Sequence, residues 1–422
     1  MSALPAGPTA SPALQTARWL MRPIAFLEAC RRRHGDAFSV NFTGFQTPLV
    51  MVSSPEAVRA LYGDRDHALP PGRTVTLRPM VGARSLLLLE GAEHLSRRRV
   101  MLPPFHGDRM RAYEPAVREA AERELDGWPT GQAFAVHPSM QAITLEVILS
   151  AVFGVADAER REGLRVLLRD LLSATVSRGL QVSVMLGRRD AMAQLEAMAG
   201  QIDSLLLDEI AARRSAPGED ICSLLVRARF DDGGQMSDRE VRDQLMTLLL
   251  AGHETTATGL AWTLDLLTRN PRTLALARED ADAGGDTYLR AVVAESLRLR
   301  PVVPLAGRRL TSDLRVDGLD VPAGTDVTPA IWLTHTRADR YPEPLAFRPE
   351  RFLADAPATY AWIPFGGGVR RCLGAAFAEM EMRVALEEIV ARRTLRPASP
   401  AAERVARRNV TFSPRGGTVV IA

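Results

Sequence analysis

One cysteine near the C-terminus, Cys372, stands in a run of residues that could present its sulfur to a metal. The run extends from Phe365 to Gly374 and follows the pattern F-x-x-G-x-R-x-C-x-G. Glycines let the backbone turn tightly beneath a flat macrocycle, where a Cβ would collide. The N-terminus of a following helix favours an ionised sulfur, and hydrogen bonds from nearby amides tune its electron donation. The pattern therefore predicts a thiolate that binds a metal ion on one axial side.

The chain has three cysteines, and their spacing contains neither a CxxC pair nor a disulfide framework. Free cysteines are usually small buried hydrophobic residues, and this is the prediction for Cys30 and Cys222. Cysteine usage of this kind favours a reducing compartment, so we expect a cytoplasmic protein.

A second group of reactive side chains lies inside a long helical pattern that extends from Ser237 to about Asn270. Ser237 and Glu240 have the spacing of a capping box, and Pro271 ends the pattern. Residues 251–256 read AGHETT and interrupt the apolar pattern at its centre. Such local violations are expected at functional sites, and an acid followed by an alcohol could deliver protons. The alternative is that the hydroxyls only bond to the carbonyl four residues back.

Two pairs of charged residues have the spacing of one helical turn. Glu295 and Arg298 are three residues apart and His94 and Arg98 are four apart, so each pair shares a helix face. Pairs of this kind are usually solvated surface contacts. The first pair is followed by residues 348–352, which read RPERF and supply further arginines.

The composition is that of a globular protein with a sizeable core. Of the 422 residues, 46% are hydrophobic, and the mean hydropathy is −0.05. No apolar run reaches the roughly 18 residues that a membrane-spanning helix needs, so we expect no membrane anchor. The net charge is +3, the chain contains no lysine, and charges of both signs are interspersed. This distribution argues against a nucleic-acid partner.

Strand-like and helical patterns divide the chain unevenly. Residues 38–42 and 48–52 predict a hairpin, and Ser54-Pro55 predicts the start of a helix. Helical periodicity dominates from about residue 105 to 300, whereas later residues form short apolar runs between turns. We therefore predict a single domain that is mainly α with a small β portion.

Together these motifs resemble those of the cytochrome P450 family, of the soluble bacterial type, over nearly the whole chain. The first residues are rich in Ala, Pro, Ser and Gly, which predicts a flexible segment over residues 1–18, and the resemblance implies a P450 domain over residues 19–422. Its cofactor would be haem b (Fe-protoporphyrin IX), held between the long central helix and the cysteine-ligand loop with its helix. Cys372 would be the axial thiolate, and Phe365, Gly366 and Gly374 would contact the cofactor.

The resemblance also implies roles for the polar residues in the long helix. Ala251 and Gly252 would leave room for dioxygen, Thr255 would hydrogen-bond to it, and Glu254 would relay protons inward. His253 is expected to be structural.

The charged motifs acquire roles by the same resemblance. Glu295, Arg298 and Arg351 would form a buried ionic triad that helps to retain the haem. The expected ligands of the haem propionates are His94, Arg98, Arg308 and Arg370, with Arg309 as the alternative to its neighbour.

A substrate pocket is implied among mainly aliphatic segments, which favours an apolar substrate such as a fatty acid, terpene or steroid. Its expected lining residues are Leu77, Met80, Leu86, Leu248, Val302, Val303, Leu305 and Phe412. Arg73, Arg78 or Arg84 could hold a substrate carboxylate, although solvated loop arginines are the more ordinary interpretation.

The implied activity is that of a monooxygenase that hydroxylates its substrate with dioxygen. No flavin, nicotinamide or iron–sulfur motif is seen, so electrons are expected from a ferredoxin or flavodoxin with its reductase. Arg97, Arg99 and Arg371 could form a basic docking face for that donor. Two other functions stay open. One is a peroxide-driven peroxygenase or haem isomerase, against which the acid–alcohol pair argues, and the other is a non-catalytic haem-based sensor.

Overall fold

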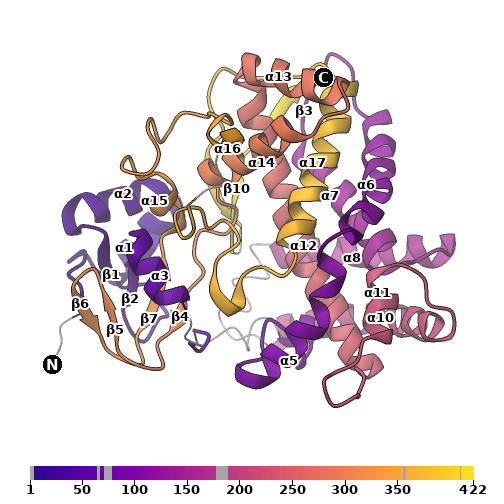
Figure 1. Ribbon diagram of the computed structural model, residues 1–422, viewed down its shortest axis with the longest axis horizontal. Helices are drawn as coiled ribbons and strands as arrows, with labels where there is room; N and C mark the ends of the chain where they lie inside the picture. The colour runs from indigo at the N-terminus through magenta and orange to yellow at the C-terminus, as the bar shows by residue number, and fades with distance from the viewer. Residues whose placement is uncertain (1–3, 64–66, 71–77, 177–188, 355–357, 409) are drawn as a thin grey trace.

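The computed structural model describes residues 4–63, 67–70, 78–176, 189–354, 358–408 and 410–422. These residues form a mainly helical structure with small sheets, as the sequence predicted. Figure 1 shows most of the strands gathered on one side of the molecule with α1, α2 and α3, while the longer helices form the other side.

The first helices along the chain are α1 (Pro12–Met21), α2 (Pro23–His34), α3 (Pro55–Tyr62), α5 (Gly91–Met101), α6 (Arg109–Asp126), α7 (His137–Val147), α8 (Ala158–Val176), α10 (Arg189–Ser215) and α11 (Ile221–Arg227). They are followed by α12 (Asp238–Thr268), α13 (Pro271–Asp282), α14 (Thr287–Leu299), α15 (Ile331–His335), α16 (Arg351–Ala354) and α17 (Ala375–Arg392). Three short helical turns are η1 (Pro103–Phe105), η2 (Ile148–Val152) and η3 (Gly368–Arg370).

The largest sheet has the order β1-β2-β7-β4, formed by β1 (Ala37–Val40), β2 (Leu49–Val52), β7 (Asp326–Pro329) and β4 (Arg308–Arg309). The predicted hairpin is confirmed, because β1 and β2 pair antiparallel, and β2 then pairs parallel with β7. The smaller sheets contain β3 (Ala133–Ala135), β11 (Val419–Ile421) and β8 (Arg396–Pro397), then β9 (Val405–Arg408) with β10 (Thr411–Pro414), and β5 (Leu314–Val316) with β6 (Leu319–Val321).

Helix α12 is the predicted long helix and runs through the centre of the helical side (Figure 1). Its 31 residues span about 46 Å at 1.5 Å per residue. The predicted capping box is confirmed, since the Ser237 side chain accepts from the Glu240 N–H and the Glu240 carboxylate accepts from the Ser237 N–H. The helix packs against α7 and α17, so its centre is fixed from two directions.

The N-terminal residues are more structured than the sequence indicated. Helix α1 begins at Pro12, inside the segment 1–18 for which flexibility was predicted. Gln15 is 1% exposed, donates to the Ala10 carbonyl at 2.7 Å and accepts from the Asn41 N–H at 2.9 Å. An Ala- and Pro-rich composition gives no sign of such a contact, because the partner lies in the β1–β2 hairpin.

Candidate active site

The cysteine loop turns between η3 and α17, and its glycines are required by the backbone. Gly366 and Gly368 have φ values of +67° and +66°, which favour glycine. A Cβ on Gly368 would lie 2.5 Å from the Tyr62 carbonyl oxygen, so α3 leaves no space for a side chain there. The Cys372 N–H donates to the Phe365 carbonyl at 2.9 Å and closes the loop. From the sequence we expected these glycines to avoid a clash with a macrocycle, whereas at Gly368 a side chain would clash with α3.

The Cys372 side chain is accessible, but the protein around it is dense. Burial raises the pKa of the thiol, and three groups oppose that effect: the nearby Gly374 N–H and the charges of Arg371 and Arg98. An accessible sulfur with an amide donor and two cations beside it is suited to become a thiolate ligand when a metal takes the place of its proton.

The centre of α12 has one accessible face in an otherwise buried helix. From Val241 to Thr268, the residues that are not buried are Leu248, Leu250, Ala251, Gly252, Glu254 and Thr255. Leu248, Ala251 and Thr255 are three and four residues apart, so they share one helix face. A Cβ on Gly252 would meet no atom within 4 Å, so that glycine borders open space. The structure thus brings Ala251, Gly252 and Thr255 to one accessible face of α12.

The Thr255 hydroxyl bonds back along its own helix. It donates to the Ala251 carbonyl at 2.5 Å, with a longer contact of 3.5 Å to the Gly252 carbonyl. The hydroxyl therefore does form the hydrogen bond to the carbonyl four residues back that the alternative interpretation expected. The hydroxyl oxygen remains able to accept a hydrogen bond from a ligand on the accessible face.

Glu254 is held by side chains of α7. Gln141 donates to its carboxylate at 2.7 Å, and the His137 ring nitrogen Nε2 lies 3.6 Å from its other oxygen. Burial raises the pKa of Glu254, which favours its protonated form. His253 lies elsewhere, with Nε2 at 3.1 Å from the Gln141 carbonyl, as expected of a structural residue. The sequence did not identify the α7 partners, because they lie more than 100 positions away.

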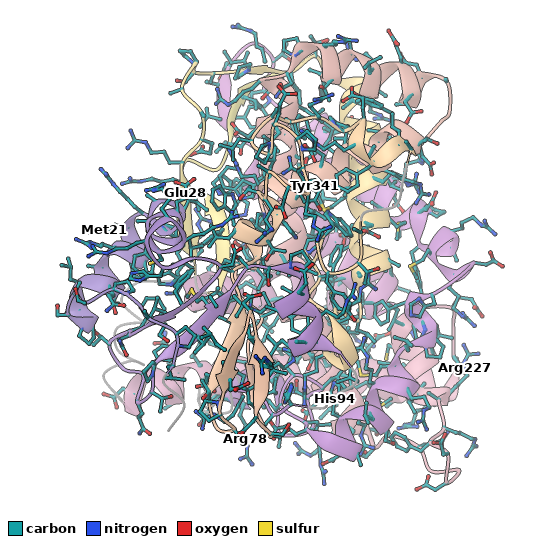
Figure 2. All side chains as sticks on the ribbon, turned by 60° about the vertical axis from the view of Figure 1, so that its left-hand side comes forward. Met21, Glu28, Arg78, His94, Arg227 and Tyr341 are labelled. Carbon is teal, nitrogen blue, oxygen red and sulfur yellow. The ribbon has the colours of Figure 1, made fainter. Side chains whose placement is uncertain are left out.

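Arginine side chains from separate elements reach the cysteine loop. Arg98 of α5 donates to the Arg371 carbonyl at 2.7 Å, and Arg308 of β4 donates to the Gly367 carbonyl at 3.3 Å. His94 lies on α5 one turn before Arg98, is 2% exposed and is labelled in Figure 2. The structure therefore places the predicted propionate ligands of α5 and β4 beside the same loop.

Arg308 and Arg309, the two alternatives for one propionate ligand, have different partners in the structure. Arg309 points away and forms two hydrogen bonds with Asp326, at 2.8 and 3.0 Å. Arg370, from the loop itself, donates to the Leu89 carbonyl at 2.8 Å and so ties the loop to the residues before α5.

The predicted ionic triad is assembled in the core behind the loop. Glu295 and Arg298 form a bidentate pair at 2.6 and 2.7 Å, and both side chains are 0% exposed. The Arg351 Nε lies 3.4 Å from Glu295, and the Arg348 N–H donates to the same carboxylate at 2.9 Å. Arg298 also donates to the Pro344 carbonyl at 2.7 Å. The carboxylate thus connects α14 to the segment that leads into α16.

A buried histidine that the sequence did not single out completes this region. The His335 ring nitrogen Nδ1 lies 3.1 Å from the Arg298 carbonyl, and Nε2 accepts from the Ile363 N–H at 2.8 Å. This pattern requires the neutral ring with its proton on Nδ1. Burial lowers the pKa of His335 to about 3. Its position at the end of α15, a helix of only 5 residues, gave no periodic signal that could have revealed it.

Acidification is expected to destabilise the protein through its buried histidines. Burial lowers the pKa of His137 and His253 to about 4 and that of His335 to about 3, from 6.5. Each ring stays neutral when folded and gains a proton on unfolding, so stability is complete above pH 6.5 and falls below it. We expect the free energy of unfolding to decrease by at most about 4 kcal/mol per pH unit, the value for three protons. Urea unfolding at successive pH values measures this slope, and His253→Gln should reduce it by about a third. A constant free energy between pH 7 and pH 5 would contradict the prediction.

The predicted substrate residues do not all lie on one surface. Met80 and Leu86 are buried in the main core beside the first half of α12, and Leu248 is on the accessible face of that helix. Phe412 instead packs 5.6 Å from the ring of Trp19 and is 2% exposed. Its position in β10 directs it into the aromatic cluster beneath α1, so the structure does not place it in the pocket.

Three other predicted substrate residues lie in the segment 302–305, which contacts the segment of Phe412. Val302 is 7% exposed and its carbonyl accepts from the Phe412 N–H, Val303 is half-buried, and Leu305 packs against the cluster of Phe412. Leu77 lies outside the described residues.

The arginines predicted to bind a carboxylate are partly described. Arg73 lies outside the described residues, and Arg78 is exposed and is labelled in Figure 2. Arg84 is also exposed and forms an ion pair with Glu93.

The predicted docking face needs one correction. Arg97 forms an ion pair with Glu240, stacks 4.3 Å from the ring of Phe230 and has a side chain only 14% exposed. Because Arg97 links α5 to α12 through this ion pair and is largely buried, its assignment to a docking face is wrong. Arg99 pairs with Asp231 but stays 66% exposed.

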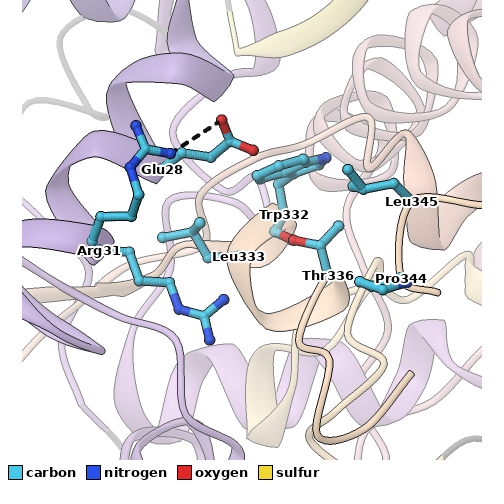
Figure 3. Close-up of a pocket in the computed structure, with 8 residues that line it drawn as sticks. Glu28, Arg31, Trp332, Leu333, Thr336, Pro344 and Leu345 are labelled. Atoms are coloured by element: carbon cyan, nitrogen blue, oxygen red, sulfur yellow. Dashed lines mark hydrogen bonds and ion pairs between the residues drawn. The ribbon is translucent and has the colours of Figure 1, made fainter. Parts of the chain in front are cut away.

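A surface pocket of about 340 Å³ lies apart from these residues, between α2, α15 and the segment that follows α15 (Figure 3). Two of its lining residues, Glu28 and Arg32, form an ion pair with a distance of 3.9 Å between Arg32 Nη1 and Glu28 Oε2. Neither the cysteine loop nor α12 contributes to its walls, which are formed by Glu28, Arg31, Arg32, Trp332, Leu333, Thr336, Pro344 and Leu345. In the part of the chain that the structure describes, no helix has the length and apolar character needed to cross a membrane.

Comparison with solved structures shows the fold. The crystal structure of the cytochrome P450DA heme domain superposes with a TM-score of 0.88 at 22% identity, covering 100% of this chain and 98% of that one. Retinoic-acid-bound cyanobacterial CYP120A1 superposes with a TM-score of 0.83 at 24% identity, covering 100% and 99%.

Comparison of sequences shows the family. Cytochrome P450 135B1 of Mycobacterium tuberculosis is 42% identical over 429 aligned positions, covering 98% of this chain and 90% of that protein. Cytochrome P450 138 of the same organism is 37% identical, covering 92% and 90%. The sequence model of the cytochrome P450 family matches residues 5–411. The chain, with its cysteine loop beside the accessible centre of α12, therefore belongs to the cytochrome P450 family of haem-thiolate monooxygenases.

Proposed function

We propose that Cys372 supplies the axial thiolate of this cytochrome P450 and that the enzyme hydroxylates an apolar substrate at an unactivated C–H bond. One observation carries the first part. The Cys372 sulfur is accessible and has the Gly374 N–H and the charges of Arg98 and Arg371 near it, all of which favour its ionised form.

The side chains around the loop fit a haem. A thiolate suits iron, and guanidinium groups suit the carboxylates of the propionates. Arg98 and Arg308 each donate to a backbone carbonyl of the loop, and Arg370, which belongs to the loop, donates to the Leu89 carbonyl before α5. We assign these three arginines, with His94, to the propionates. When bound, haem supplies the oxygen-activating chemistry, which electron donation from a thiolate assists.

The protein side chains manage protons. Glu254 is held at α7 with its pKa raised by burial, so it can store a proton within the polar contacts of Gln141 and His137. Thr255 presents its hydroxyl on the accessible face of α12, and its hydrogen bond to Ala251 fixes the orientation of that hydroxyl. We infer that Glu254 supplies protons to the accessible face of α12, where the Thr255 hydroxyl oxygen accepts a hydrogen bond from the protonated oxygen ligand, while Gly252 keeps the space beside it open.

Replacing Thr255 by alanine should separate electron consumption from product formation. The hydroxyl is proposed to hold the oxygen ligand in place for a proton transfer step, and such steps contribute about 10²–10⁴-fold to rates. We therefore expect product formed per reducing equivalent to fall by about 10²-fold, with the excess electrons released as peroxide. The measurement compares reducing equivalents consumed, peroxide and hydroxylated product for the same preparation.

Thr263 provides a matched control on the same helix. Its hydroxyl also bonds to the carbonyl four residues back, that of Gly259, at 2.8 Å, but it is fully buried. Thr263→Ala should keep the wild-type ratio of product to electrons. An equal loss in both variants would show that Thr255 acts only on helix structure.

The proposed substrate class follows from the aliphatic side chains on and beside α12, such as Leu248, Met80 and Leu86. This class is tested by titrating the holoenzyme with a panel of fatty acids, terpenes and steroids. Binding is measured as the change in the haem absorption spectrum when a ligand displaces water from the iron. Electrons are proposed to come from a ferredoxin or flavodoxin with its reductase. Turnover with peroxide alone and none with such a system would instead support a peroxygenase.

A further inference from the structure

Polar side chains of α12 bind the backbone of the segment 78–90, which leads into α5. Gln244 is 0% exposed and uses both ends of its carboxamide. Its Nε2 donates to the Arg84 carbonyl at 2.6 Å, and its Oε1 accepts from the Leu86 N–H at 3.0 Å. These two bonds reproduce the way in which a neighbouring strand would pair with the segment.

Two further residues of α12 extend this contact, and we call Asp243, Gln244 and Thr247 the α12 clamp. Asp243 accepts from the Arg84 N–H at 2.9 Å, and the Thr247 hydroxyl lies 2.6 Å from that of Ser85. Both hydroxyls are buried. Gly82 has a φ of +80°, and a Cβ there would lie 1.9 Å from the Asp243 carboxylate, so the segment approaches α12 without a side chain.

The clamped segment bridges the two halves of the active site. The clamp ends at Thr247, immediately before Leu248 and four residues before Ala251 on the accessible face. At the other end of the segment, the Leu89 carbonyl accepts from Arg370, two residues before Cys372. Any shift of the segment along α12 would therefore move it relative to both the oxygen-binding face and the cysteine loop.

We propose that the α12 clamp sets the position of residues 78–90 and thereby determines which apolar ligands fit above the haem. Its members are positioning residues, because none is proposed to touch the reacting atoms. The chemical reason is that four directed hydrogen bonds fix the register of a segment whose apolar side chains, including Met80 and Leu86, only require burial. The proposal rests on the proposed function, since it requires haem at Cys372.

The test uses the holoenzyme and two probes that need no knowledge of the natural substrate. Imidazole binds haem iron alone, whereas 1-dodecylimidazole binds the iron and also places an alkyl chain in the pocket. Gln244→Leu keeps the size of the side chain but removes both hydrogen bonds. We expect it to weaken binding of dodecylimidazole by about tenfold, the effect of removing a buried hydrogen-bond partner, and to leave imidazole binding unchanged. Hydrogen exchange of the Leu86 amide should become faster in the same variant.

Thr268→Val is the control, because Thr268 is buried on α12 and bonds only to carbonyls of its own helix. It should leave both affinities and the Leu86 amide unchanged. If Gln244→Leu does not yield a folded holoenzyme, the milder Ser85→Ala decides, with the same expectations. The proposal is overturned if both probes lose affinity equally, or if neither does while the amide exchanges faster. If the wild-type holoenzyme did not show the absorption spectrum of a thiolate-ligated haem, the proposed function would be overturned instead.

Discussion

Replacing Cys372 by serine should remove the haem-thiolate signature completely. The alcohol oxygen is not ionised at neutral pH, so it cannot replace the thiolate that the Gly374 amide and the neighbouring arginines are arranged to hold. We expect little haem in the purified variant and no hydroxylation above the level of free haem. The absorption spectrum of the reduced carbon monoxide complex measures this directly, because its position reports the axial ligand.

The other two cysteines provide controls within the same chain. Cys30 and Cys222 are 3% and 0% exposed, and burial raises the pKa of each thiol, to about 11 and about 12. Alanine at either position should leave the spectrum unchanged. If Cys372→Ser kept the thiolate signature, the assignment of the iron ligand, and the roles of the residues around it, would be wrong.

Removing Glu295 should have the largest effect on stability. The carboxylate is fully buried and neutralises Arg298, with Arg351 beside it. Glu295→Leu would leave the buried Arg298 guanidinium without a counterion, and breaking a buried pair in this way costs about 3–5 kcal/mol. We expect a reduction of that size in the free energy of unfolding, measured with urea on the holoenzyme, together with faster loss of haem.

A surface pair of the same geometry tests whether burial is the cause. Glu162 and Arg165 on α8 are also three residues apart, but Glu162 is 59% exposed. Glu162→Gln should change the free energy of unfolding by no more than about 1 kcal/mol, as for other exposed pairs. If the two substitutions had similar effects, the triad would be an ordinary contact and its role in haem retention would have to be abandoned.

Local patterns in the sequence were sufficient to predict several secondary-structure elements and the tight turns of the cysteine loop. The capping box at Ser237, the β1–β2 hairpin and the glycines near Cys372 each depend on neighbours within a few residues. Glu295 and Arg298 could be paired from sequence for the same reason, because they lie one helical turn apart. What the sequence could not show was that this pair is completely buried.

Contacts between distant segments required the tertiary structure. Arg97 was expected on a docking face but pairs with Glu240, and Phe412 was expected in the pocket but packs against Trp19. Gln244 looked like an ordinary residue of a long helix, yet its carboxamide holds a segment about 160 residues earlier in the chain.

The sequence by itself determined which cysteine lies in a glycine-rich loop before a helix and which helix carries the acid and the alcohol, since those properties depend on residue type and short spacing. Only the tertiary structure decided where Glu254 points, what each arginine neutralises and how the segment before α5 is held. The physical reason is that a buried polar group must find a partner, and the fold, not the order of the residues, brings that partner within hydrogen-bonding distance.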